Sequence, residues 1–172
     1  MPKKNVDVKT ALSERLDAEI RRLGATNALF VHAVASRLGL NPTDYECLDV
    51  LDWTGPITAG HLAQHLGLTS GAISGMLDRL EAAGWVRRDR DETDKRKVVV
   101  TLLRTRFAEV APLYEGSNRA IADLSARLSA DDMKAVIGAL ATMNDAFAAE
   151  AIRLRAEQHT RVPGRAVEPK SR

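Results

Sequence analysis

The sequence predicts a mainly α-helical chain with one small β-hairpin, and three observations between residues 57 and 102 carry this prediction. Two short segments have apolar residues at helical spacing, a single glycine separates them, and two short β-branched or apolar runs follow with a charged stretch between them. Two helices, a tight turn and a hairpin in this order are typical of a winged helix-turn-helix. Long helical patterns precede and follow this segment.

The two short helices are predicted from their caps and their apolar spacing. The first runs from Thr58 to Leu66 with Thr58 as its N-cap, and Gly67 allows the sharp turn that follows. Thr69 caps the second helix, and Gly84 closes it. Its inner positions are apolar, namely Ile73, Met76, Leu77 and Leu80. Its outward face is small or polar and favours close approach to a groove; it carries Ser70, Gly71, Ser74, Gly75, Asp78 and Arg79.

The hairpin is predicted from a change of periodicity after Gly84. One strand is expected from Trp85 to Arg88 and its partner from Lys97 to Leu102, with a loop between them that is too polar to be buried. A charged hairpin tip is by itself typical of a solvated loop. Directly after a helix-turn-helix it favours contact with phosphates or a neighbouring minor groove. The candidate cations are Arg87, Arg88, Arg90, Lys95, Arg96 and Lys97.

Several short motifs occur together in this segment: Leu62-Ala63, Leu66-Gly67-Leu68-Thr69, Asp78-Arg79-Leu80-Glu81, Gly84, Arg88 and Asp94-Lys95-Arg96. In this combination the central third of the chain resembles the MarR family of bacterial transcription regulators. The resemblance implies that the second helix enters the major groove and that Arg96 enters the minor groove. It also implies that Asp94 supports the wing, and that Arg79 serves structure or phosphate contact rather than base reading.

The chain departs from the family pattern at three positions. Leu103 and Arg106 stand where the family often has Thr and Gly, so the entry to the next helix is expected to differ. Gly75 stands where many members carry a larger polar or basic residue, which argues against a base contact from this position.

From the resemblance we predict a DNA-binding transcription regulator without catalytic residues or a cofactor. It would be a repressor that binds palindromic operator DNA as a homodimer and is released by a small-molecule effector. Phosphate contacts are expected from Arg88, Lys95 and Arg96. Major-groove contacts are expected from Ser70, Gly71, Ser74 and Arg79. The alternative is a winged-helix protein-interaction module without sequence-specific DNA binding; an enzyme is the weakest option, because the acids show no pairing and no Gly-rich loop follows a strand.

Composition sets wide bounds on the class of protein. The chain has 172 residues, 45% of them hydrophobic, and a net charge of +2, which neither requires nor excludes nucleic acid. Between residues 79 and 106, however, nine Lys or Arg stand against five Asp or Glu. The single cysteine, Cys47, excludes an intrachain disulfide and agrees with a reducing compartment. No signal peptide or membrane span is expected, which predicts a cytoplasmic protein.

Long helices flank the central segment. One is predicted from Thr10 to Leu38, one from Asn41-Pro42 to about Trp53, and two after the hairpin, 105–128 and 129–158. Their apolar stripes fit either the core of a monomer or, as the resemblance implies, a dimer interface. The predicted organisation is an N-terminal dimerisation helix (1–40), a winged helix-turn-helix DNA-binding domain (41–104), C-terminal dimerisation helices (105–158) and a disordered basic tail (159–172).

Three further features suggest chemistry or ligands. His61 and His65 have a spacing that suits a metal, but no third ligand stands at a matching spacing, so a solvated or phosphate-facing role is favoured. Cys47 is a candidate redox sensor, yet it shares a helical face with Leu48 and Leu51, which favours an inert buried thiol. The candidate effector pocket, for a small aromatic or phenolic compound, comprises His32, Tyr45 and Trp53, although lone aromatic residues near an apolar stripe more often belong to a core.

Overall fold

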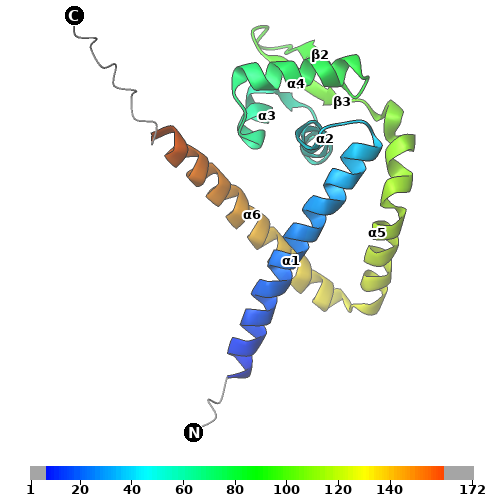
Figure 1. Cartoon of the computed structure of the whole chain (residues 1–172), viewed down its shortest axis with the longest axis vertical. Coiled ribbons are helices and arrows are strands. Elements are labelled where there is room, and N and C mark those ends of the chain that lie inside the picture. Colours follow the sequence, from blue (N-terminus) through cyan, green and yellow to red (C-terminus); the bar gives the residue numbers. More distant parts are fainter. Residues whose placement is uncertain (1–6, 161–172) are drawn as a thin grey trace, which may run out of the picture. The chain divides into compact units, whose positions relative to one another are not determined.

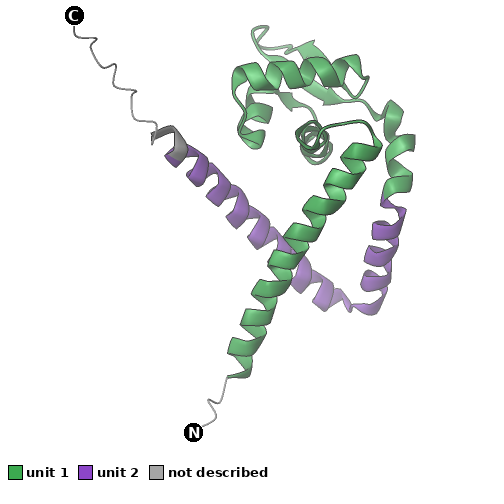
Figure 2. Cartoon of the chain, in the orientation of Figure 1, with its two compact units in different colours: residues 1–113 green, residues 114–172 purple. Residues whose placement is uncertain are grey.

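The computed structural model of the chain describes residues 7–160 and confirms a mainly helical fold with a small antiparallel sheet. Two compact units divide it, residues 1–113 and 114–172, shown in green and purple in Figure 2. In chain order the elements, labelled in Figure 1 where there is room, are α1 (Val8–Arg37), α2 (Pro42–Thr54), β1 (Ile57–Thr58), α3 (Ala59–Leu66), α4 (Ser70–Ala82), β2 (Val86–Arg90), β3 (Val98–Leu102), the 3-10 turn η1 (Arg104–Arg106), α5 (Phe107–Arg127) and α6 (Ala130–Thr160).

The three-stranded sheet has the order β1-β3-β2, with both pairs antiparallel. Val100 at its centre pairs with Ile57 on one side and with Arg88 on the other, and its side chain is fully buried. The strand β1 was not predicted, because two residues are too few to show a periodicity. Through its pairing with β3, β1 connects the start of α3 to the β2–β3 hairpin. We call this hairpin the wing (residues 86–102).

The core of the first unit lies where α2, α3 and α4 pack around this sheet. Trp85 is buried directly after α4, and its backbone N–H donates to the Leu80 carbonyl. The most deeply buried large side chains are Leu51, Leu62, Met76, Leu80, Trp85, Val86 and Val100. Burial of these apolar groups is the main driving force that fixes α3 and α4 against the wing.

The predicted starts of α3, α4 and α6 are confirmed by their cap hydrogen bonds. The hydroxyl oxygens of Thr58 and Thr69 each accept from a backbone N–H three residues on, at 3.3 Å. Ser129 and Asp132 bond each other reciprocally at the start of α6. Gly84 has a φ of +73° directly after the last residues of α4, the left-handed conformation that favours glycine.

Some predicted boundaries were wrong by one or two residues. The first strand of the wing begins at Val86 and runs to Arg90. The Trp85 N–H closes the end of α4, while the Trp85 carbonyl accepts from the Leu103 N–H at 2.8 Å. The α1 helix begins at Val8, where the Asp7 side chain accepts from the Lys9 N–H. The η1 turn precedes α5, which therefore begins at Phe107.

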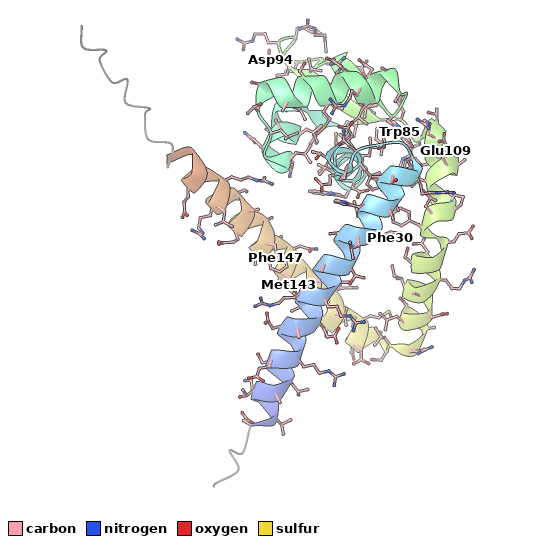
Figure 3. All side chains as sticks on the ribbon, in the orientation of Figure 1. Phe30, Trp85, Asp94, Glu109, Met143 and Phe147 are labelled. Carbon is pink, nitrogen blue, oxygen red and sulfur yellow. The ribbon has the colours of Figure 1, made fainter. Side chains whose placement is uncertain are left out.

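The second unit exposes most of its apolar side chains. None of the described side chains of α5 or α6 is buried, and α1 in the first unit likewise exposes an apolar row. The exposed large apolar residues on these three helices include Leu12, Leu16, Leu23, Leu29, Ile121, Leu124, Val136, Ile137, Leu140 and Phe147. Figure 3 labels Met143 and Phe147 on α6. Exposed apolar rows of this kind, on each helix by itself, are typical of interaction faces.

The α6 segment Ala130–Glu157 is also long and apolar enough to cross a bilayer, with a mean hydropathy of 1.3 in its best 18-residue window. The expectation that no segment meets this criterion was therefore wrong. The core helix of a soluble protein can meet the same criterion, so length and composition alone do not place α6 in a membrane. The predicted basic tail begins within the last turn of α6, and from residue 161 onward it lies outside the described residues.

Candidate nucleic-acid interface

The outward face of α4 is open and built from small side chains. Gly67 has a φ of +66° and forms the turn between α3 and α4. The inner face of α4 is held by four buried residues, Ile73, Met76, Leu77 and Leu80. This leaves Ser70, Gly71 and Ser74 exposed in the first turns of the helix. A backbone of another molecule therefore meets little steric hindrance along this face.

The wing tip is organised by two aspartates. The Asp91 carboxylate accepts from the backbone N–H groups of Thr93 and Asp94, at 2.9 and 2.8 Å, and these bonds hold the pKa of Asp91 below its usual value. The Asp94 carboxylate accepts from the Arg96 backbone N–H and from its Nε, at 3.2 and 3.1 Å. Asp94 lies in the loop between β2 and β3 (Figure 3). The role of Asp91 was missed by sequence reasoning, although an acid followed by Thr and Asp is a recognisable turn signal.

The wing tip presents cations to solvent. The Arg96 side chain is 92% exposed, and its contact with Asp94 is an exposed ion pair of the weak kind. Lys95 is exposed as well, and its backbone carbonyl accepts from the Arg90 guanidinium at 2.9 Å. A phosphate or a groove edge could therefore compete for Arg96 at small cost.

Arg88, in contrast, connects the wing to α4. Its guanidinium donates to Glu81 at 2.6 and 2.8 Å and pairs with Asp78 at 2.7 Å, and its backbone N–H also donates to Glu81. Hydrogen bonds to Glu81 and then Asp78 raise the pKa of Arg88. A phosphate at this predicted contact would have to compete with two carboxylates.

Arg79 is also held in an ion pair. It donates from Nε and Nη2 to the two oxygens of the buried Asp44 carboxylate, at 3.0 and 2.6 Å, and from Nη1 to the Gly75 carbonyl at 3.1 Å. Asp44 is the only buried charged residue in the described part of the chain. Sequence reasoning assigned Asp44 only to the start of α2, because nothing local announces a partner 35 positions away.

Two cavities lie beside α3. One of about 300 Å³ is lined by α3, α4 and the wing, including Ala63, Ser70, Ser74, Leu77 and Arg88. The other, of about 420 Å³, lies between the start of α3 and the wing and is lined by His61, Gln64, Arg96 and Lys97 among others. Both therefore border the surface that carries the predicted DNA-binding residues.

The three candidate effector residues have different surroundings. Tyr45 is buried in α2, and it donates a hydrogen bond to Asp49 that opposes a rise in the pKa of that acid. His32 is exposed on α1, and Trp53 is 67% exposed at the end of α2. The Trp53 ring meets the His65 ring edge to face, with centroids 5.4 Å apart. None of the three side chains lines either of the two cavities beside α3.

The metal and redox candidates have clear surroundings. Among the described residues no group of three or more metal-ligating side chains accompanies His61 and His65. Cys47 is fully buried, and burial first, then the nearby Asp44 charge, raises its pKa to about 12. A thiol in this state is a poor nucleophile.

Comparisons with known proteins agree with this geometry. The profile described as MarR family matches residues 40–98. The HTH-type transcriptional regulator YcgE of Bacillus subtilis (strain 168) is 33% identical over 135 residues, 78% of this chain and 88% of that protein. The HTH-type transcriptional repressor Rv2887 of Mycobacterium tuberculosis (strain ATCC 25618 / H37Rv) is 33% identical over 81 residues, 47% of this chain and 58% of that protein. A crystal structure of MarR superposes with a TM-score of 0.50 at 25% identity, covering 91% of this chain and 99% of that one. The chain belongs to the MarR family of helix-turn-helix transcriptional regulators.

Proposed function

We propose that the protein binds palindromic operator DNA as a homodimer, with α4 in the major groove and the wing tip at the adjacent minor groove. The observation that carries the proposal is the open face of α4, with Ser70, Gly71 and Ser74, next to a wing whose tip cations are exposed. A small-residue face permits close approach to base edges, and exposed cations near it supply phosphate or minor-groove contacts.

Affinity should depend mainly on the wing tip and on the pairing of two modules. Arg79 pairs with the buried Asp44 and Arg88 pairs with two carboxylates, whereas Lys95 is exposed and Arg96, which is 92% exposed, contacts Asp94 in a weak surface pair. Each phosphate contact contributes a salt-dependent increment, so few free cations predict a modest salt slope per subunit. Two modules about one helical turn apart would double these contacts and read a palindrome.

The homodimer is supported by the exposed apolar rows of α1, α5 and α6. A soluble single chain rarely exposes this much contiguous apolar surface, and a two-fold partner would cover it with the same surface of a second copy. Sedimentation of the full chain at micromolar concentration should give a dimer. A monomer at this concentration would contradict this part of the proposal.

Repression and effector release complete the proposal. Repression is supported by the similarity to a mycobacterial HTH-type transcriptional repressor, and a cytoplasmic location is consistent with a regulator of transcription. A small aromatic or phenolic effector is proposed to contact His32, Tyr45 and Trp53 in the assembled dimer and to favour a geometry that no longer matches the half-site spacing. Titration of bound DNA with simple phenolic carboxylates tests this step.

The decisive experiment is a mobility shift with fragments of the source genome across a salt series. Retention of a subset of fragments, weakening steadily with salt and resisting excess mixed-sequence competitor, is the expected result. Sequencing of the retained fragments should give a two-fold symmetric motif. Failure to retain any fragment at low salt would instead favour a protein-interaction module.

A further inference from the structure

The α4 helix contains one cation, and the structure ties its guanidinium to groups of the protein itself. Arg79 is the only Lys or Arg in α4 (Ser70–Ala82). All three of its guanidinium nitrogens donate within the protein, two to Asp44 and one to the Gly75 carbonyl. The bidentate pairing raises the pKa of Arg79. The charge of Arg79 is therefore matched, at contact distance, by an opposite charge.

Asp44 is committed to this pair because of where it lies. Its side chain is 5% exposed, and its backbone N–H donates to Asn41, which caps α2. A buried carboxylate without a partner is strongly unfavourable, so Asp44 requires the guanidinium. Arg79 is different, since its side chain is 58% exposed, and its guanidinium would be released toward a phosphate if the carboxylate were neutral.

We infer that Asp44 is a specificity-determining positioning residue, which holds Arg79 against α2 and so keeps the exposed face of α4 free of a cation that would seek phosphates. The inference rests on the proposed DNA-binding function. Phosphate contacts supply nearly all non-specific affinity, whereas base contacts supply discrimination. Removing one free cation from the groove-facing helix therefore lowers affinity for any DNA without loss of base contacts, and the ratio of specific to non-specific affinity rises.

The test compares salt slopes for four proteins: wild type, Asp44→Asn, Arg79→Gln and the double variant. The probes are one genomic fragment retained in the mobility shift and one mixed-sequence duplex. Asp44→Asn should steepen the salt slope by about one per subunit, because Arg79 is freed for a phosphate. Its affinity for the mixed-sequence duplex at low salt should rise severalfold, and its specificity ratio should fall. Arg79→Gln and the double variant should keep the wild-type slope.

A matched control is Asp52→Asn on the same helix, which breaks the exposed ion pair between Asp52 and Arg104 and should leave the slope unchanged. A role of Asp44 in stability alone would move the unfolding midpoint but not the slope. Hence an unchanged slope in folded Asp44→Asn overturns the inference.

Arg79→Gln keeps the inference testable if Asp44→Asn does not fold. A slope about one unit shallower in Arg79→Gln would show that Arg79 already contacts a phosphate in the wild type, and would overturn the inference. A wild-type protein that binds neither probe overturns the proposed function and the inference with it. If the wild type binds DNA but the salt slopes of the variants differ from those expected, the inference is overturned and the proposed function stands.

Discussion

The Arg106 guanidinium lies over the buried ring of Trp85, with its Cζ 4.2 Å from the ring centroid. The same guanidinium donates to the Ala83 carbonyl at 3.1 Å and pairs with Glu109 at 2.6 Å. Figure 3 labels Trp85 and Glu109 at the end of α4 and the start of α5. Through these contacts Arg106 joins the end of α4 to the segment that leads into α5.

Replacement of Arg106 should destabilise the first unit. Arg106→Ala loses a cation–π contact with a buried ring and a hydrogen bond to Ala83, so the free energy of unfolding should fall by about 1 kcal/mol. Urea denaturation followed by Trp fluorescence measures the loss. Arg104→Ala is the control, because its guanidinium stacks on Phe107 from a more exposed position, and its loss should be smaller. Equal losses would mean that stacking on Trp85 is not the stabilising contact.

The wing tip should contribute one phosphate or minor-groove contact per subunit through Arg96. Arg96→Ala should weaken binding to a retained genomic fragment and reduce the salt slope by about one per subunit. A salt titration of the mobility shift or of fluorescence anisotropy measures both quantities. Lys134→Ala removes another exposed, ion-paired cation, from α6, and should change neither. Unchanged affinity of Arg96→Ala across the salt series would remove the wing tip from the mechanism.

The Asp49 carboxyl group should make the free energy of unfolding depend on pH. Burial first raises its pKa from 3.8 to about 6, against the opposing hydrogen bond from Tyr45. The folded chain binds the Asp49 proton more tightly than the unfolded chain does. The contribution of Asp49 to the free energy of unfolding is therefore fully present below about pH 4, and it is lost as the pH rises to about 6. Asp49→Asn removes this decline.

The expected effect of Asp49→Asn is a gain of about 1–2 kcal/mol in the free energy of unfolding at pH 7–8, vanishing near pH 4. Urea denaturation at several pH values gives the comparison. Asp123→Asn, at an exposed position of α5, should show no such pH-dependent difference. A constant difference between wild type and Asp49→Asn at all pH values would mean that Asp49 does not titrate in this range.

Local signals explain which elements the sequence could predict. Thr58, Thr69 and Ser129 each cap a helix by accepting a hydrogen bond from a residue three positions on. Both partners therefore stand within one short stretch of sequence, where the pattern can be recognised. The buried stripe of α4 follows from its helical spacing in the same way. The prediction of the helix-turn-helix and the wing therefore required no knowledge of tertiary contacts.

Long-range contacts explain what the sequence could not predict. Asp44 and Arg79 are 35 positions apart, and Arg106 reaches back 23 positions to Ala83, so no local pattern contains either pair. The two-residue strand β1 exists only because β3 offers it an edge. Arg79 and Arg88 were predicted to contact DNA, and nothing in the sequence indicated the carboxylates that pair with them in the fold.

Cys47 should behave as an inert core residue. Its thiol is fully buried and its pKa is about 12, so almost no thiolate forms at neutral pH. A thiol-specific reagent at pH 8 should label the native protein only at the rate of unfolding and should label the denatured protein at once. Brief peroxide treatment should leave DNA binding unchanged. Rapid labelling of the native protein would revive Cys47 as a redox sensor.

Gly71, which is exposed in the first turn of α4, is a position where one substitution should affect stability and DNA binding in opposite directions. A Cβ at Gly71 would meet no atom within 4 Å, so Gly71→Ala fits the folded chain and should raise the free energy of unfolding by about 0.5–1 kcal/mol. If α4 approaches a groove closely, however, the same methyl group meets the DNA. Binding should then weaken about tenfold, which corresponds to about 1.4 kcal/mol for one lost groove contact. Gly24→Ala in α1, which also meets no neighbour, should stabilise the chain without loss of affinity. A Gly71→Ala variant that is more stable and binds as tightly as the wild type would show that this face of α4 does not enter the groove.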